Sequence, residues 1–215
     1  MEAKLEVGAL LRGTAEVVSS TPAGSLGYIA GLGALGSAMD LLNPESLSNM
    51  PYTIASVIAG FFLLRAMLVN TGVAQAGESR RVGAYFGLSI LSGLGILLGL
   101  VLLVVPGVIL VVRWLLAYAI LISEETTVTG ALSESWDRTR EQFWPLLAAT
   151  LLVFVMGAAA LAIYVSNDIV PGVPLEAALV AGNFMLAAMT VIYTALGVEA
   201  YRALRGDQGL PEVFA

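Results

Sequence analysis

Long apolar segments separated by short polar ones dominate the pattern of this chain. A helix needs about 20 apolar residues to cross the roughly 30 Å hydrocarbon core of a membrane. Six segments approach or exceed this length with few charges, namely residues 23–42, 52–74, 83–105, 108–123, 145–165 and 175–202. The pattern predicts an all-α, polytopic membrane helix bundle, with a single membrane domain over residues 1–215.

Two further segments have the amphipathic pattern of helices that lie in the membrane interface. In residues 3–20, apolar side chains such as Leu10 and Val17 share one helical face and the charged side chains lie away from it. Residues 128–143 show the same separation, with Trp136 on the apolar face. We expect both segments to lie flat on the membrane surface.

The third and fourth segments form one apolar run of about 40 residues, from Val82 to Ser123. A straight helix of that length would be about 60 Å long, twice the thickness of the hydrocarbon core. The run must therefore fold back on itself. Pro106 has no amide proton and Gly107 tolerates a positive φ, so the pair suits the centre of a type II turn. The sequence predicts a tight hairpin turn there, and hence six spans arranged as three hairpins.

The basic residues support this topology, because loops on the cytoplasmic side of a membrane collect Lys and Arg. Alternate loops contain basic residues and the loops between them contain none. We therefore expect a multi-pass protein with both termini in the cytoplasm. The basic residues in the expected cytoplasmic segments are Lys4, Arg12, Arg80, Arg81, Arg138, Arg140, Arg202 and Arg205.

The composition excludes several kinds of catalytic site and binding partner. The 215 residues are 58% hydrophobic and 12% charged, with a mean hydropathy of +0.89, whereas soluble domains contain about a quarter charged residues. The absence of cysteine and histidine excludes disulfides, His-based catalytic triads and the usual zinc sites. The net charge of −6 argues against nucleic acid as a partner. We expect no catalytic residues, no metal and no cofactor.

Two arginines fall inside predicted spans, where a charge is costly unless it has a partner or reaches the membrane surface. Arg65 lies nearer the inner side, within reach of Glu199 near the end of the last span. Arg113 is expected about 8 Å from the outer surface, given the helical rise. Each arginine has two interpretations, a structural ion pair or a site for an anionic headgroup or substrate. The acids near the expected level of Arg113 are Asp40, Asp168 and Glu176.

The segment that leads into the fifth span carries aromatic and basic residues suited to headgroup depth. Trp136, Phe143 and Trp144 are the expected interfacial anchors. Arg138 and Arg140 are candidates to hold lipid phosphates, although anchoring of the topology explains them equally well.

These residues carry a family resemblance. A Val-Pro-Gly segment, an apolar helix with Arg-Trp, an acidic end and then "ALSESWDRTREQFW" resemble the membrane-domain family of glycerophosphoryl diester phosphodiesterases and related small bacterial inner-membrane proteins. The resemblance implies an all-helical domain with interfacial helices, in a bacterial cytoplasmic membrane. Some members are joined to a phosphodiesterase barrel with catalytic histidines, and no such activity is expected of this chain. Departures from the family pattern fall at Ser133, Glu134 and Glu141.

We therefore expect a non-catalytic integral membrane protein that binds membrane lipids or another membrane protein and acts as an accessory or envelope-organising factor. The alternative is a small transporter or channel for an anionic solute or lipid. Self-association is compatible with both interpretations.

Overall fold

A computed structural model describes residues 5–42, 50–75, 81–165 and 174–206 of the chain. Within these ranges every regular element is a helix, which confirms the predicted all-α polytopic fold. The helices are α1 (Val7–Ser20), α2 (Pro22–Leu42), α3 (Met50–Asn70), α4 (Val82–Leu102), α5 (Val104–Arg113), α6 (Ala117–Ser123), α7 (Val128–Arg138), α8 (Phe143–Val165) and α9 (Leu175–Gly206).

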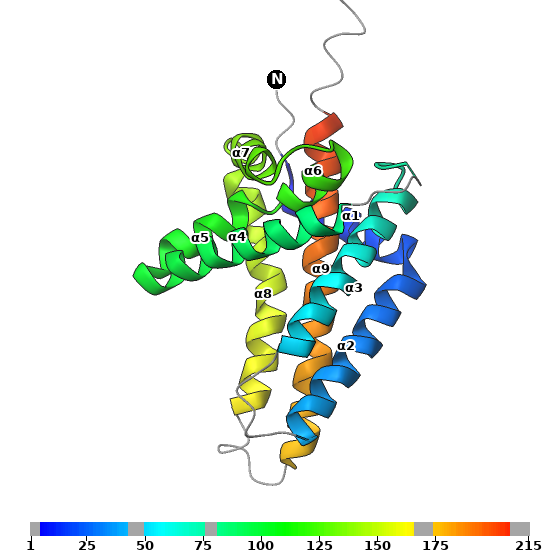
Figure 1. Cartoon of the computed structure of the whole chain (residues 1–215). Helices are drawn as coiled ribbons and strands as arrows, with labels where there is room; N and C mark the ends of the chain where they lie inside the picture. Colours follow the sequence, from blue (N-terminus) through cyan, green and yellow to red (C-terminus); the bar gives the residue numbers. More distant parts are fainter. Residues whose placement is uncertain (1–4, 43–49, 76–80, 166–173, 207–215) are drawn as a thin grey trace, which may run out of the picture.

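Helix α9 is the central element of the bundle. Helices α2, α3, α8 and α9 extend along a similar direction (Figure 1), and α1, α2 and α8 have their most extensive contacts with α9. The segments Pro22–Leu42, Met50–Asn70, Val82–Leu102, Val104–Ser123 and Leu175–Arg205 are long and apolar enough to cross a membrane, and α8 adds a sixth if it is combined with α7. The chain is a polytopic membrane protein.

The observed helix ends differ from the expected ones where local backbone chemistry intervenes. Helix α3 stops at Asn70 because Gly72 adopts a φ of 72°. The amide of Gly72 then donates to Val69 O, and the amide of Val73 donates to Leu68 O. These bonds satisfy carbonyls that a helix end would otherwise leave unpaired.

The predicted turn at Pro106 and Gly107 is wrong. The chain reverses instead at Leu103, whose φ of −160° and ψ of 131° interrupt the helix for one residue. Pro106 lies in the first turn of α5, a position that requires no amide hydrogen bond. Gly107 is helical too, and among the described residues Gly72 is the only glycine with a positive φ.

Gly107 allows α5 to lie close to α4. A Cβ atom added at Gly107 would overlap the side chain and backbone of Leu100. The glycine therefore permits close packing of the two helices rather than a change in chain direction.

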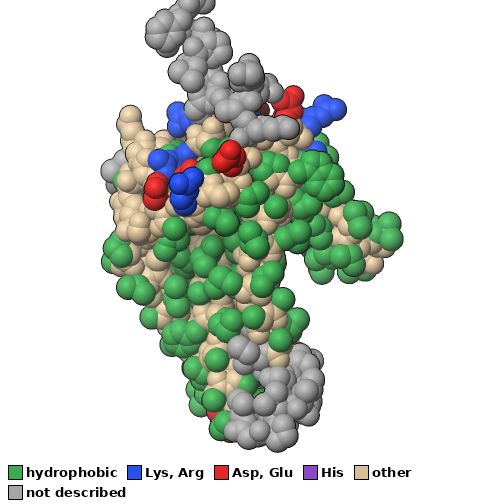
Figure 2. All heavy atoms as spheres, turned by 180° about the vertical axis from the view of Figure 1, so that it is seen from behind, with side chains coloured by type: hydrophobic (Ala, Val, Ile, Leu, Met, Phe, Trp, Pro, Cys, Tyr) green, Lys and Arg blue, Asp and Glu red, His purple; other side chains and the backbone are tan. Residues whose placement is uncertain are grey.

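The hairpin of α4 and α5 lies across the long axis of α2, α3, α8 and α9 (Figure 1). Its apolar tip, residues 101–105, is 67–75% exposed. Figure 2 shows the apolar side chains of this arm extending from the side of the bundle. Three equivalent hairpins would all be parallel to one another. The middle hairpin instead crosses the other helices.

The expected fourth span, residues 108–123, is not one helix. Helix α5 ends at Arg113, and α6 begins at Ala117. Two carbonyls next to this break accept hydroxyl hydrogen bonds, Arg113 O from Ser135 at 2.7 Å and Val111 O from Tyr193 at 3.2 Å. Gly197 of α9 also passes close to a carbonyl within the break. Contacts from distant helices therefore support the break.

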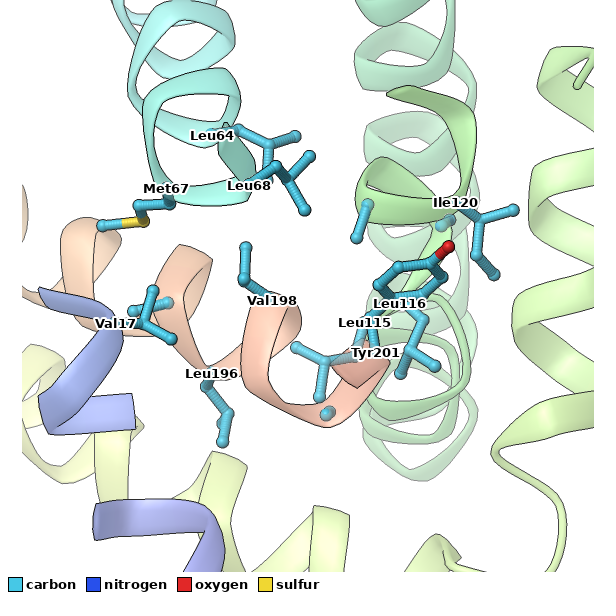
Figure 3. Close-up of a cluster of buried hydrophobic side chains, with 14 of the residues drawn as sticks. Val17, Leu64, Met67, Leu68, Leu115, Leu116, Ile120, Leu196, Val198 and Tyr201 are labelled. Atoms are coloured by element: carbon cyan, nitrogen blue, oxygen red, sulfur yellow. The ribbon is translucent and has the colours of Figure 1, made fainter. Parts of the chain in front are cut away.

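The core lies where α1, α3, α6 and α9 meet (Figure 3). Tyr201 of α9 is fully buried there, and its ring lies beside Leu116 and Ile120 (Figure 3). Other buried members of this cluster are Val17, Leu64, Met67, Leu68, Leu115, Leu116, Ile120, Leu196 and Val198. The core fixes the ends of α6 and α9, and hence the charged groups next to them.

Candidate functional site

Charged side chains gather at one end of the bundle, where α6 and α9 end and α7 lies (Figure 2). We call this region the charged end. It contains ion pairs between Arg138 and Glu124 and between Arg202 and Glu199. Two arginines at the charged end, Arg138 and Arg113, have different surroundings. Among the described residues, carboxylates contact Arg138 but not Arg113.

Helix α7 positions the first environment. Thr127, which precedes its first residue, accepts a hydrogen bond from the amide of Gly130 at 3.1 Å and caps the helix. Arg138 lies in the last turn, where a cation complements the helix dipole. Its Nε donates to Glu134 four residues earlier at 2.8 Å.

Arg138 also binds the end of α6 through both terminal nitrogens. Its Nη1 and Nη2 donate to the two carboxylate oxygens of Glu124 at 2.7 and 2.9 Å. The Tyr201 hydroxyl donates to the same carboxylate at 2.8 Å. Burial opposes ionisation of Glu124, but the hydrogen bonds from Arg138 and Tyr201 outweigh it and lower the pKa of Glu124. This group ties α6, α7 and α9 together and leaves Arg138 fully engaged.

Arg81 fixes the segment between α6 and α7. Its guanidinium donates to the carbonyls of Leu121 at 3.1 Å and Thr126 at 2.7 Å, and also to that of Glu125. Glu125 has a φ of 52°, a conformation that is rare outside glycine. Arg81 therefore stabilises a tight connection rather than an open binding surface.

The second environment surrounds Arg113, whose backbone carbonyl accepts a hydrogen bond from Ser135 of α7. Its guanidinium carbon lies 5.2 Å from the ring centre of Trp136 and 5.1 Å from that of Phe143. Its Nη1 donates a long, 3.4 Å hydrogen bond to Trp136 O. Its Nε is buried and has no hydrogen-bond partner. No carboxylate in the described part of the chain forms an ion pair with Arg113.

This location corrects the sequence prediction, which placed Arg113 on the side of the membrane opposite Trp136 and Phe143. The prediction assumed a turn at Pro106 and a continuous helix after it. In the structure α5 has only 10 residues, about 15 Å of helix, and lies across the bundle. Arg113 at its end therefore reaches α7.

Arg140 extends this second environment. It lies in the short connection between α7 and α8, which meet at 109°. Its side chain is exposed and forms no hydrogen bond or ion pair with the described residues, yet it is close enough to interact electrostatically with Arg113. Trp144, the second residue of α8, is 74% exposed.

We define the cationic-aromatic site as Arg113, Arg140, Trp136, Phe143 and Trp144. The Arg113 guanidinium lies beside two aromatic rings, and Arg140 is close enough to interact with it electrostatically. Neither arginine has a paired carboxylate among the described residues. Guanidinium groups bind phosphate and carboxylate oxygens through paired N–H donors. The site can therefore accept an anionic group at the level where tryptophan rings meet the membrane surface.

The structure separates the remaining predicted residues from this site. Glu199, which was expected to reach Arg65, instead forms an ion pair with Arg202 at 3.0 Å. The Glu199 side chain also fills the space beside Gly13 of α1. Arg65 is half-buried on α3.

A cavity with tyrosine and threonine side chains in its lining lies inside the bundle and was not predicted from the sequence. This cavity of about 180 Å³ beside the break between α5 and α6 is lined by Tyr85, Tyr118, Tyr193 and threonines of α9. The Tyr118 hydroxyl is 2.8 Å from the Ser92 hydroxyl. Tyrosines in apolar spans gave only a weak signal, because they also serve as membrane-interface anchors.

Comparison with known proteins identifies the family. No curated protein and no solved structure is significantly similar to the chain. One family model, described as the membrane domain of glycerophosphoryl diester phosphodiesterase, matches residues 88–201. The match runs from α4 to α9, covers more than half of the chain and includes the whole cationic-aromatic site. The chain therefore belongs to the family of glycerophosphoryl diester phosphodiesterase membrane domains.

Proposed function

We propose that this membrane protein is a non-catalytic lipid-binding protein whose cationic-aromatic site holds the phosphate of an anionic phospholipid. The observation that carries the proposal is the contrast between Arg113 and Arg138. Two carboxylates engage Arg138, whereas Arg113 has a buried Nε without a partner. A phosphate group would supply an acceptor for the terminal nitrogens of Arg113, which make only one long hydrogen bond, and a counter-ion for Arg140.

The surroundings favour a lipid over a soluble anion. Trp136 and Trp144 are 40% and 74% exposed, and such rings prefer the boundary between hydrocarbon and headgroups. Basic residues near an anionic membrane surface contribute about 1 kcal/mol each to its binding. A lipid with a net negative charge therefore satisfies both the aromatic and the cationic parts of the site.

The proposal also covers the membrane in which the protein lies and the orientation of the protein in that membrane. In this proposal, the charged end faces the cytoplasm and the membrane is a bacterial inner membrane. The described arginines Arg12, Arg81, Arg138, Arg140, Arg202 and Arg205 support this orientation through the preference of basic residues for the cytoplasmic side. The non-catalytic role rests on the lack of histidine and cysteine in the sequence.

A second candidate function is transport of a small anion or lipid. Residues 108–123 were expected to form one span, but the structure breaks the helix between α5 and α6. Transporters often bind substrate beside such breaks, and the cavity of about 180 Å³ with tyrosines and threonines in its lining is adjacent to it. Anion efflux from vesicles that contain the purified protein would support this function over lipid binding alone.

The test of lipid binding compares the double variant Arg113→Gln, Arg140→Gln with the wild type. Purified protein is titrated with phosphatidylglycerol in phosphatidylcholine nanodiscs, and bound phosphatidylglycerol is counted by native mass spectrometry. We expect the double variant to bind phosphatidylglycerol about tenfold to thirtyfold more weakly, as the loss of about 2 kcal/mol implies.

Arg12→Gln is the matched control, because Arg12 is exposed on α1 and only reaches Gly8 O of its own helix. This variant should bind phosphatidylglycerol at most about fivefold more weakly, since it removes one basic residue worth about 1 kcal/mol and leaves the cationic-aromatic site intact. Equal phosphatidylglycerol binding by wild type and double variant would contradict the proposal.

A further inference from the structure

A groove with a different chemistry lies along α9, nearer its N-terminal end. It has a volume of about 740 Å³, within the range of pockets that hold drug-sized ligands. Helix α9 contributes one side, and α2, α8 and the start of α3 contribute the others. The main lining residues are Met39, Asp40, Phe154, Leu161, Asn183 and Met189.

Small residues keep this groove open between the helices. A Cβ atom at Gly36 of α2 would overlap the amide of Asn183, and one at Gly157 of α8 would overlap the sulfur of Met189. Larger side chains at Gly36 and Gly157 would therefore displace the groove's lining. Gly182 of α9 lines the same space.

The groove is polar at one end and apolar along its length. Asn183 donates a 2.8 Å hydrogen bond to the Asp40 carboxylate, and Tyr52 lines the same end. Asp40 is two residues from the end of α2, so it lies where that helix leaves the apolar region. From there the groove runs inward along Phe154 and Met189.

This arrangement has the polarity of a membrane lipid, with the headgroup near the surface and the chain directed inward. The carboxylate of Asp40 selects the sign of the headgroup. Among the described residues, Asp40 and Glu176 are the charged groups near this end, whereas the arginines lie at or toward the charged end. A cation is the complementary group.

We infer that the groove binds one phospholipid with a primary-ammonium headgroup, whose nitrogen pairs with Asp40 and whose acyl chain lies between α8 and α9. An ammonium group offers three N–H donors to the carboxylate. The apolar walls replace neighbouring lipid chains around the bound chain. This site is separate from the cationic-aromatic site and has the opposite charge preference.

The test uses photoactivatable lipids with the reactive group in the acyl chain. Wild-type protein in phosphatidylcholine nanodiscs is irradiated with labelled phosphatidylethanolamine or labelled phosphatidylglycerol, and the labelled peptides are mapped by mass spectrometry. We expect phosphatidylethanolamine to label residues 154–161 and 182–189 about tenfold more than phosphatidylglycerol does, a preference that corresponds to one favourable charge contact.

Asp40→Asn should remove this preference while keeping the size of the side chain near Asn183. Glu176→Gln, which alters the other acid near this end without touching the groove, should keep it. Ala158→Phe places a ring in the groove at an exposed position and should reduce labelling by both lipids, while gel filtration shows that the protein remains folded.

Three outcomes would overturn the inference. The first is equal labelling by the two lipids in the wild type, which indicates unselective contact with surrounding lipid. The second is an unchanged preference in Asp40→Asn. The third is a groove that a second copy of the protein fills in place of lipid, so that residues 154–161 and 182–189 are not labelled by either lipid. The double variant Arg113→Gln, Arg140→Gln should leave this labelling unchanged, so the two proposed sites fail or succeed separately.

Discussion

Arg138, in the last turn of α7, and Arg113, which packs against α7, have contrasting surroundings. Three nitrogens of Arg138 contact two carboxylates. Arg113 lies between two aromatic rings, with one buried nitrogen unpartnered. An arginine whose donors are occupied stabilises the fold, whereas one held among aromatic rings beside a second cation retains capacity for a ligand. Residue type and position at the membrane surface do not distinguish these two roles.

The largest expected effect comes from removing the structural arginine. Arg138→Gln leaves Glu124 without its bidentate partner in a half-buried environment, and we expect a loss of about 2 kcal/mol in the free energy of unfolding. Urea unfolding in detergent micelles measures it.

Arg113→Gln is the comparison for this variant. We expect it to cost less than about 1 kcal/mol, because it removes mainly cation–π contacts. A larger loss for Arg113→Gln than for Arg138→Gln would reverse the assignment of structural and ligand-binding roles.

Acid should weaken the same structural group. Glu124 lies just beyond α6, and its pKa in the folded protein is below its ordinary value. Its contribution to stability is therefore fully present above the unfolded-state pKa of about 4.3 and is lost as the pH falls through the lower folded-state pKa. Unfolding measured between about pH 6 and pH 3 should show this loss in the wild type, over the interval set by those two pKa values.

Glu124→Gln should have a flatter pH dependence over this interval, because the variant lacks the titrating carboxylate. Identical pH profiles for the two proteins would show that other acids dominate the acid response.

A smaller effect is expected at the break beside Arg113. Ser135→Ala removes the 2.7 Å hydrogen bond to Arg113 O, and Thr139 can replace it only in part, from 3.4 Å. We expect a loss of about 1 kcal/mol in unfolding free energy, measured by the same urea titration. Ser133→Ala, at an exposed position of the same helix, should not lose stability, because alanine favours a helix more than serine does. An equal loss in both variants would indicate that the hydrogen bond to Arg113 O is not responsible.

The sequence predicted the helical class and the apolar segments because both depend on local composition. Residues 23–42 became α2 and residues 145–165 became most of α8 with little change. The interfacial segment 128–143 was placed correctly as a helix at the start, but it ends at Arg138.

The failures have one source, the packing of the middle hairpin. The pair Pro106 and Gly107 is compatible both with a hairpin turn and with the start of a tightly packed helix. The local sequence therefore does not distinguish the two. The break at residues 114–116 contains neither proline nor glycine, and its hydrogen bonds come from Ser135 and Tyr193 on distant helices. The packing of the middle hairpin determines the surroundings of Arg113, so these surroundings could not be predicted from the spacing of residues along the chain.

Tryptophan fluorescence tests the central claim most directly, because Trp136 lies against Arg113. Brominated phosphatidylglycerol, diluted in unbrominated phosphatidylcholine, should quench wild-type fluorescence more strongly than brominated phosphatidylcholine at the same mole fraction. Arg113→Gln should strongly reduce this difference, and Arg12→Gln should reduce it less. Equal quenching by the two brominated lipids in the wild type would contradict the assignment of the cationic-aromatic site to an anionic lipid.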